Sequence, residues 1–111
     1  MATSVGARVS YRVSEAGLTT FRVRRVARGR RVRNTCVAPT RRNRGAEPCT
    51  RYVQMRGSFR RLNRRGSNSF RFTGRLAGRR LPAGRYRLRA RVKDTSGNLS
   101  VWVRAPFRIR R

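Results

Sequence analysis

The sequence has few of the side chains that most often carry catalysis or bind metal ions: two cysteines and three acids. The chain has no histidine, and its acids are Glu15, Glu47 and Asp94. Acid–base hydrolysis needs two convergent carboxylates, a catalytic cysteine needs a histidine partner, and a structural metal needs about four ligands. Because the acids lie in three separate turns, the sequence predicts no catalytic residue, no cofactor and no metal site, and therefore no enzyme.

Cys36 and Cys49 flank a segment rich in residues that favour turns. Those residues are Pro39, Asn43, Gly45 and Pro48. Two cysteines in this arrangement indicate a disulfide, which persists in oxidising compartments and predicts an extracellular or cell-surface location. In the chain-entropy model, closing a loop of about 15 residues contributes roughly 3 kcal/mol. Free thiols in a reducing environment are the alternative.

Charge is the most unusual property of the chain. Its 31 basic residues against three acids give a net charge of +28, and Lys93 is the only lysine. Such a charge opposes compaction and attracts polyanions. The other explanation for the excess of arginine over lysine is a GC-rich coding bias, which places arginine at solvated basic positions.

The clearest strand pattern follows Gly84 and separates arginines from apolar residues with a period of two. The arginines are Arg85, Arg87, Arg89 and Arg91; the apolar set is Tyr86, Leu88, Ala90 and Val92. Side chains on one strand face repeat at about 6.6–6.8 Å, close to the spacing of successive phosphates. With Arg71 and Arg22 on neighbouring strands, these arginines predict a face for nucleic acid, acidic polysaccharide or an anionic surface. A merely solvated outer face is the alternative.

Trp102 is the one candidate among the aromatic residues for a stacking platform for bases. A position in the core or over a sheet edge is the other interpretation of Trp102. No recognition helix or zinc finger is present, so any nucleic-acid binding is expected to be independent of base sequence.

Alternation of apolar and polar residues, interrupted by turns, recurs along the chain and predicts an antiparallel β-sandwich. We expect a single domain over residues 7–111, a disordered extension over 1–6, and a long loop over 27–50 closed by Cys36–Cys49. Residues 1–6 lack the pattern of a secretion signal, so any signal should lie outside this chain. No apolar run is long enough for a transmembrane helix.

The run from Leu81 to Leu88 resembles the tyrosine corner of fibronectin type III and related immunoglobulin-like domains. Leu81, Gly84 and Tyr86 match the motif, whereas Pro82 stands two residues before Gly84 rather than directly before it. The order of the other turns and strands is similar to immunoglobulin-like repeats of large secreted bacterial proteins. The resemblance implies an immunoglobulin-like sandwich of about seven strands, in which the Tyr86 hydroxyl bonds to backbone.

Two functions follow as expectations. The leading hypothesis is a non-catalytic, extracellular structural or spacer module of a larger secreted or cell-surface protein, because that is the usual role of such repeats. The alternative is a sequence-independent binding module for polyanions. In both cases we expect a monomer that has the other domains of its parent protein as neighbours.

Overall fold

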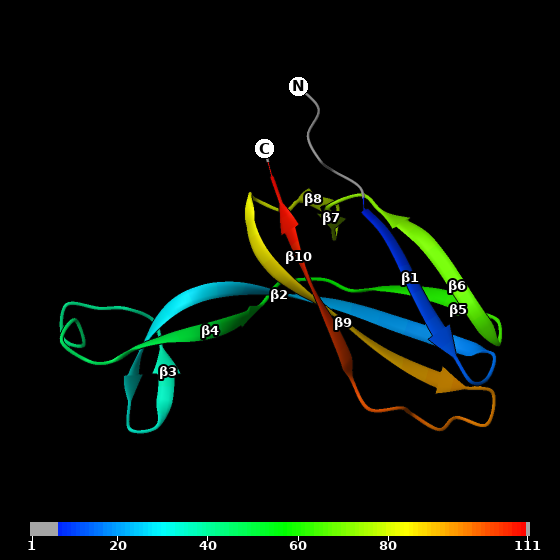
Figure 1. Cartoon of the computed structure of the whole chain (residues 1–111), viewed down its shortest axis with the longest axis horizontal. Helices are drawn as coiled ribbons and strands as arrows, with labels where there is room; N and C mark the ends of the chain where they lie inside the picture. The colour runs from blue at the N-terminus through cyan, green and yellow to red at the C-terminus, as the bar shows by residue number, and fades with distance from the viewer. Residues whose placement is uncertain (1–6, 111) are drawn as a thin grey trace.

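The computed structural model describes residues 7–110, and in this range the chain is all-β and every strand pair is antiparallel (Figure 1). The prediction for residues 1–6 lies outside the described range. Seven strands have five residues or more: β1 (Ala7–Val13), β2 (Gly17–Val32), β4 (Pro48–Gln54), β5 (Phe59–Asn63), β6 (Gly66–Phe72), β9 (Gly84–Asp94) and β10 (Val103–Ile109). Three short strands complete the fold: β3 (Thr35–Val37), β7 (Arg75–Leu76) and β8 (Arg79–Arg80). Within residues 7–110 no helix could cross a membrane.

Two sheets face each other around the core. The smaller sheet pairs β1 with β6, and the larger has the order β10-β9-β2, with β5 along the first part of β2. These findings confirm an antiparallel all-β fold, and the arrangement is consistent with an immunoglobulin-like sandwich. A hairpin of β7 and β8 lies between β6 and β9 in the chain.

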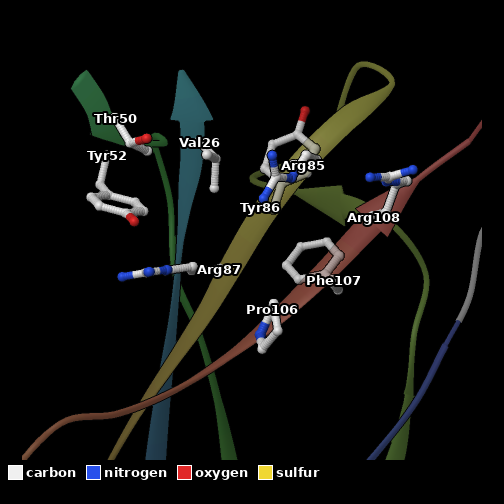
Figure 2. Close-up of a pocket in the computed structure, with 9 residues that line it drawn as sticks. All are labelled: Val26, Thr50, Tyr52, Arg85, Tyr86, Arg87, Pro106, Phe107 and Arg108. Carbon is white, nitrogen blue, oxygen red and sulfur yellow. The ribbon is translucent and has the colours of Figure 1, made fainter. Parts of the chain in front are cut away.

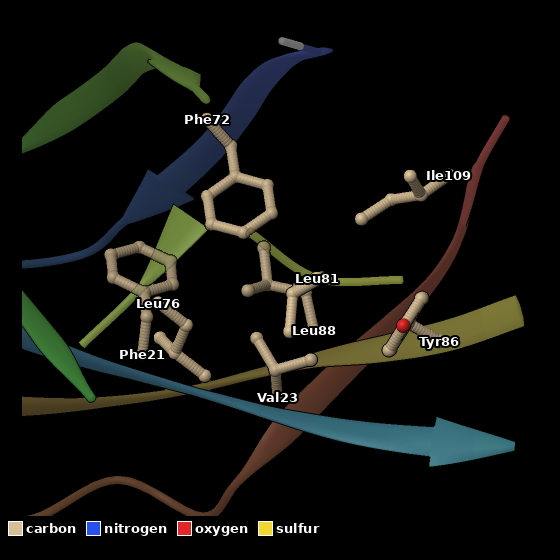
Figure 3. Packing of buried hydrophobic residues seen from close by; sticks show 8 residues of the cluster. All are labelled: Phe21, Val23, Phe72, Leu76, Leu81, Tyr86, Leu88 and Ile109. Atoms are coloured by element: carbon tan, nitrogen blue, oxygen red, sulfur yellow. The ribbon is translucent and has the colours of Figure 1, made fainter. Parts of the chain in front are cut away.

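Aromatic and aliphatic side chains fill the space between the sheets (Figure 3). The period of two predicted from the sequence places Phe21 and Val23 of β2, and Tyr86 and Leu88 of β9, on the inner face, where all four are buried. Four further buried residues complete the cluster: Phe72, Leu76, Leu81 and Ile109. Packing of these residues buries the apolar area that stabilises the sandwich.

Residues 26–54 form an arm that projects from the sandwich (Figure 1). The radius of gyration is 16.6 Å, whereas a compact domain of about 100 residues has a value near 13 Å. The prediction of a long loop over 27–50 is wrong for much of that range. The reason is that β2 continues to Val32 and is flanked by β3 and β4. Arg33 and Asn34 form the two-residue turn between β2 and β3, both with positive φ, as tight hairpins require.

The Cys36–Cys49 disulfide joins β3 to β4 across β2, with the two Cα atoms 6.0 Å apart. Arg30 pairs with Val37 on β3 and with Pro48 on β4, so these strands lie on opposite edges of β2. The disulfide passes over Gly29, where a Cβ atom would lie 2.4 Å from the Cys36 sulfur. Glycine is therefore needed at this point so that the disulfide can cross the strand.

Tyr86 has the environment of a tyrosine corner. Its side chain is 1% exposed, and its hydroxyl donates a hydrogen bond of 2.5 Å to the backbone carbonyl of Pro82. Gly84 has a φ of 153°, a conformation that residues with side chains rarely adopt. Leu81 lies beside them in the buried cluster.

We expect Tyr86→Phe to lower the free energy of unfolding by about 1–3 kcal/mol, because the carbonyl of Pro82 loses its donor. Urea denaturation followed by circular dichroism measures the change. Tyr52→Phe is the matched control, since Tyr52 is partly exposed, and it should leave the stability unchanged. Equal stability of the Tyr86 variant and the parent would show that this hydrogen bond does not stabilise the fold.

Candidate anion-binding face

The four arginines of β9 all project from the outer surface of the larger sheet. Tyr86 and Leu88 of the same strand are buried, so the alternating arginines must point to the other side. Arg85 is exposed, whereas Arg87, Arg89 and Arg91 are half-buried. Neighbouring residues therefore cover part of Arg87, Arg89 and Arg91.

Neighbouring strands place further arginines directly opposite those of β9. Arg89 faces Arg22 of β2 on one side and Arg104 of β10 on the other. Arg87 faces Arg24, and Arg85 faces Arg108. Residues directly opposite in a sheet point to the same side, and like charges in such pairs are destabilising.

We call this surface the arginine face. Its members are Arg22, Arg24, Arg85, Arg87, Arg89, Arg91, Arg104 and Arg108.

The electrostatics of Arg89 reflect this crowding. Its pKa is lowered from the usual value, first by burial and then by repulsion from four neighbouring arginines. These are Arg24, Arg22, Arg104 and Arg91, and no carboxylate is among the causes. An anion that binds here would therefore meet several guanidinium groups at once.

Two aromatic rings lie among the arginines, with guanidinium groups against them. The guanidinium carbons of Arg89 and Arg91 both lie 4.6 Å from the ring centre of Trp102, and that of Arg22 lies at 5.7 Å. Arg87 lies 3.8 Å from the ring centre of Tyr52, which comes from β4 in the arm. Cation–π contacts of this kind partly offset the repulsion, and they occupy ring surface that bases would need for stacking.

Of the arginines predicted to share a face, Arg22 joins the four of β9 and Arg71 does not. Arg71 lies on β6, in the smaller sheet, where it faces Arg8 of β1. Alternation within a strand shows that Arg71 points outward, but it does not show to which sheet the strand belongs. The prediction that Arg71 contributes to this face is therefore corrected.

Sequence reasoning missed Arg24, Arg104, Arg108 and Tyr52. Arg24 belongs to the outward set that Arg22 begins, so strict alternation along β2 could have included it. Tyr52 reaches the face only because β4 pairs with the outer part of β2. That pairing was not predicted, because the outer part of β2 was assigned to a loop.

A hollow of about 370 Å³ opens on the arginine face where the arm meets the sandwich (Figure 2). Arg85, Arg87 and Arg108 surround it, with Val26 and Pro106 as apolar parts of its lining. Thr50 and Tyr52 line the side that belongs to the arm. The hollow thus brings three members of the arginine face together with apolar and hydroxyl side chains.

The structure brings two of the three acids together, although the sequence placed all three in separate turns. Glu47 lies apart, just before β4, but Glu15 after β1 and Asp94 at the end of β9 line the same hollow, and their side chains interact. The Asp94 carboxylate accepts hydrogen bonds from the backbone N–H groups of Asn98 and Ser96, and the bond from Asn98 is the largest cause of its lowered pKa. Among residues 7–110 no three potential ligands from histidine, cysteine, aspartate and glutamate come together in a group that could hold a metal ion.

No family model, no curated protein and no solved structure matches this chain. The immunoglobulin-like resemblance therefore depends on the sequence motifs and on the geometry described above.

Proposed function

We propose that this chain is a non-catalytic, extracellular immunoglobulin-like module of a larger secreted or cell-surface protein, and that its arginine face binds polyanions. The observation that carries the proposal is the direct opposition of arginines on three adjacent strands. Arg22, Arg89 and Arg104 form one row across the sheet. Because like charges in such positions destabilise a sheet, a bound polyanion supplies the missing compensation.

The disulfide supports the extracellular part of the proposal. Cys36 and Cys49 are bonded in the structure, and such bonds persist where the environment is oxidising. Arginine suits this role because its planar guanidinium group forms paired hydrogen bonds with oxyanions.

A structural or spacer role without a specific ligand is the second candidate. The contacts of Trp102 with three arginines favour it, because they offset part of the repulsion without any bound partner. In that case the arginines act only through total charge, and their positions on the sheet are unimportant.

Two quadruple variants of equal charge separate the candidates. One replaces Arg85, Arg87, Arg89 and Arg91 with glutamine; the other replaces Arg28, Arg30, Arg31 and Arg33 in the arm. We expect the first to reduce the logarithmic salt dependence of binding to duplex DNA by up to about four units, given a slope of about 0.9 for each phosphate contacted. The arm variant should change it much less.

Titrations with duplex DNA and with heparin at two salt concentrations measure the effect. Circular dichroism spectra check that both variants keep the fold. Equal losses in the two variants would favour the spacer role and contradict a binding face.

A further inference from the structure

We infer that the hollow beside the arm binds one anionic sugar unit of an acidic polysaccharide, held at its sulfate or carboxylate group by Arg85 and Arg108. This inference rests on the proposed function and names the ligand class and its main point of attachment.

Arg85 and Arg108 are the facing pair on the arginine face in which the described residues compensate neither guanidinium group. They lie directly opposite on β9 and β10. The described residues supply no hydrogen bond, carboxylate or aromatic ring to either side chain, whereas Arg87 lies against Tyr52 and Arg89 against Trp102. An oxyanion placed between two guanidinium groups accepts charge-assisted hydrogen bonds from both.

The lining suits a sugar ring better than a lone ion. A volume of about 370 Å³ falls in the range of small-molecule sites, about 300–1,000 Å³. Thr50 and Tyr52 offer hydroxyl groups for sugar hydroxyls, and Val26 and Pro106 offer apolar surface for the C–H groups of the ring. Figure 2 shows Arg87 extended beneath the ring of Tyr52, with Arg85 and Arg108 on the other side of Val26.

Two observations favour polysaccharide over nucleic acid. Proteins that bind single strands stack bases on aromatic side chains, but the rings of Trp102 and Tyr52 are occupied by guanidinium groups. The disulfide indicates an oxidising environment such as the cell exterior, and acidic polysaccharides are among the polyanions found there.

Three double variants that each remove two positive charges test the inference: Arg85→Gln with Arg108→Gln at the hollow, Arg22→Gln with Arg104→Gln elsewhere on the arginine face, and Arg8→Gln with Arg71→Gln on the other sheet. Calorimetric titration with short oligosaccharides gives the affinity. We expect the hollow variant to lose about tenfold or more in affinity, because hydrogen bonds to charged groups contribute about 1.5–3 kcal/mol. The Arg22/Arg104 variant should lose less affinity than the hollow variant, and the Arg8/Arg71 variant should lose least.

Four probes identify the ligand: a sulfated heparin oligosaccharide, an oligogalacturonate, single-stranded DNA and duplex DNA. We expect the affinity for one of the two oligosaccharides to depend on Arg85 and Arg108 more strongly than the affinity for either DNA does. The identity of that oligosaccharide shows whether the hollow binds a sulfate or a carboxylate group. Two results would overturn the inference but leave the proposed binding face intact. One is an equal loss of oligosaccharide affinity in the Arg85/Arg108 variant and the Arg22/Arg104 variant. The other is a loss of DNA affinity in the Arg85/Arg108 variant as large as its loss of oligosaccharide affinity. Equal losses in all three variants would overturn the proposed function itself.

Discussion

Phe21→Ala is expected to lower the free energy of unfolding by about 3–5 kcal/mol, as for other buried phenylalanines. Phe21 is 1% exposed. Its ring centre lies 5.6 Å from that of Tyr11, 4.9 Å from Phe59 and 5.0 Å from Phe70. The side chain thereby joins β2 and β5 of the larger sheet to β1 and β6 of the smaller sheet.

The loss should be severe in this chain because small domains have only about 5–15 kcal/mol of stability, and a charge of +28 opposes compaction further. Urea denaturation monitored by circular dichroism measures the effect. Leu62→Ala on β5 is the control, since Leu62 is 86% exposed and surface substitutions usually change stability by less than about 0.5 kcal/mol. A Phe21 variant as stable as the control would show that the aromatic cluster does not hold the sheets together.

Replacing both Cys36 and Cys49 with serine is expected to open the arm while the sandwich stays folded. The chain-entropy model assigns about 3 kcal/mol to a loop of this size. None of the residues from 26 to 54 belongs to the buried core cluster, so the arm has little apolar packing to replace the disulfide. Local opening of this kind is set by the contacts of the segment itself.

Hydrogen exchange of backbone amides distinguishes the two parts of the molecule. Amides of β3 and β4 should exchange faster in the double-serine variant by a factor of about 100, which corresponds to about 3 kcal/mol, and those of β9 should be unchanged. Gly29→Ala should have a similar effect, because its Cβ would lie 2.4 Å from the Cys36 sulfur and 2.9 Å from the Val37 carbonyl oxygen. Loss of protection in β9 as well would mean that the arm and the sandwich unfold as one unit.

The sequence predicted the sandwich where one strand face is apolar and the other polar. In β9 each arginine alternates with an apolar residue, so the buried side of the strand could be identified before its partners were known. In the arm the same rule fails, because Arg28 to Arg31 have no apolar face, and strand structure there comes from pairing on both edges of β2. Asn34 was the available signal, since asparagine favours the positive φ of a tight hairpin.

The prediction of the arginine face was incomplete for a related reason. Alternation shows which residues of one strand share a side, and it correctly grouped the arginines of β9. It does not show which strands are neighbours, so Arg104 and Arg108 of β10 were missed and Arg71 of β6 was included. Strand order depends on the whole set of tertiary contacts, which no short window of sequence contains.

Under the proposed function, the rows of facing arginines also link the stability of the folded chain to its ligand. Folding brings Arg22, Arg89 and Arg104 side by side, and unfolding separates them again, so an anion that needs the row binds the native state more tightly than the unfolded chain. A ligand at 100 times its dissociation constant adds at most about 2.7 kcal/mol to the free energy of unfolding, and binding to the unfolded chain reduces this gain. Proteases attack the unfolded chain, so under the proposed function we expect a bound polyanion to slow the proteolysis of this protein.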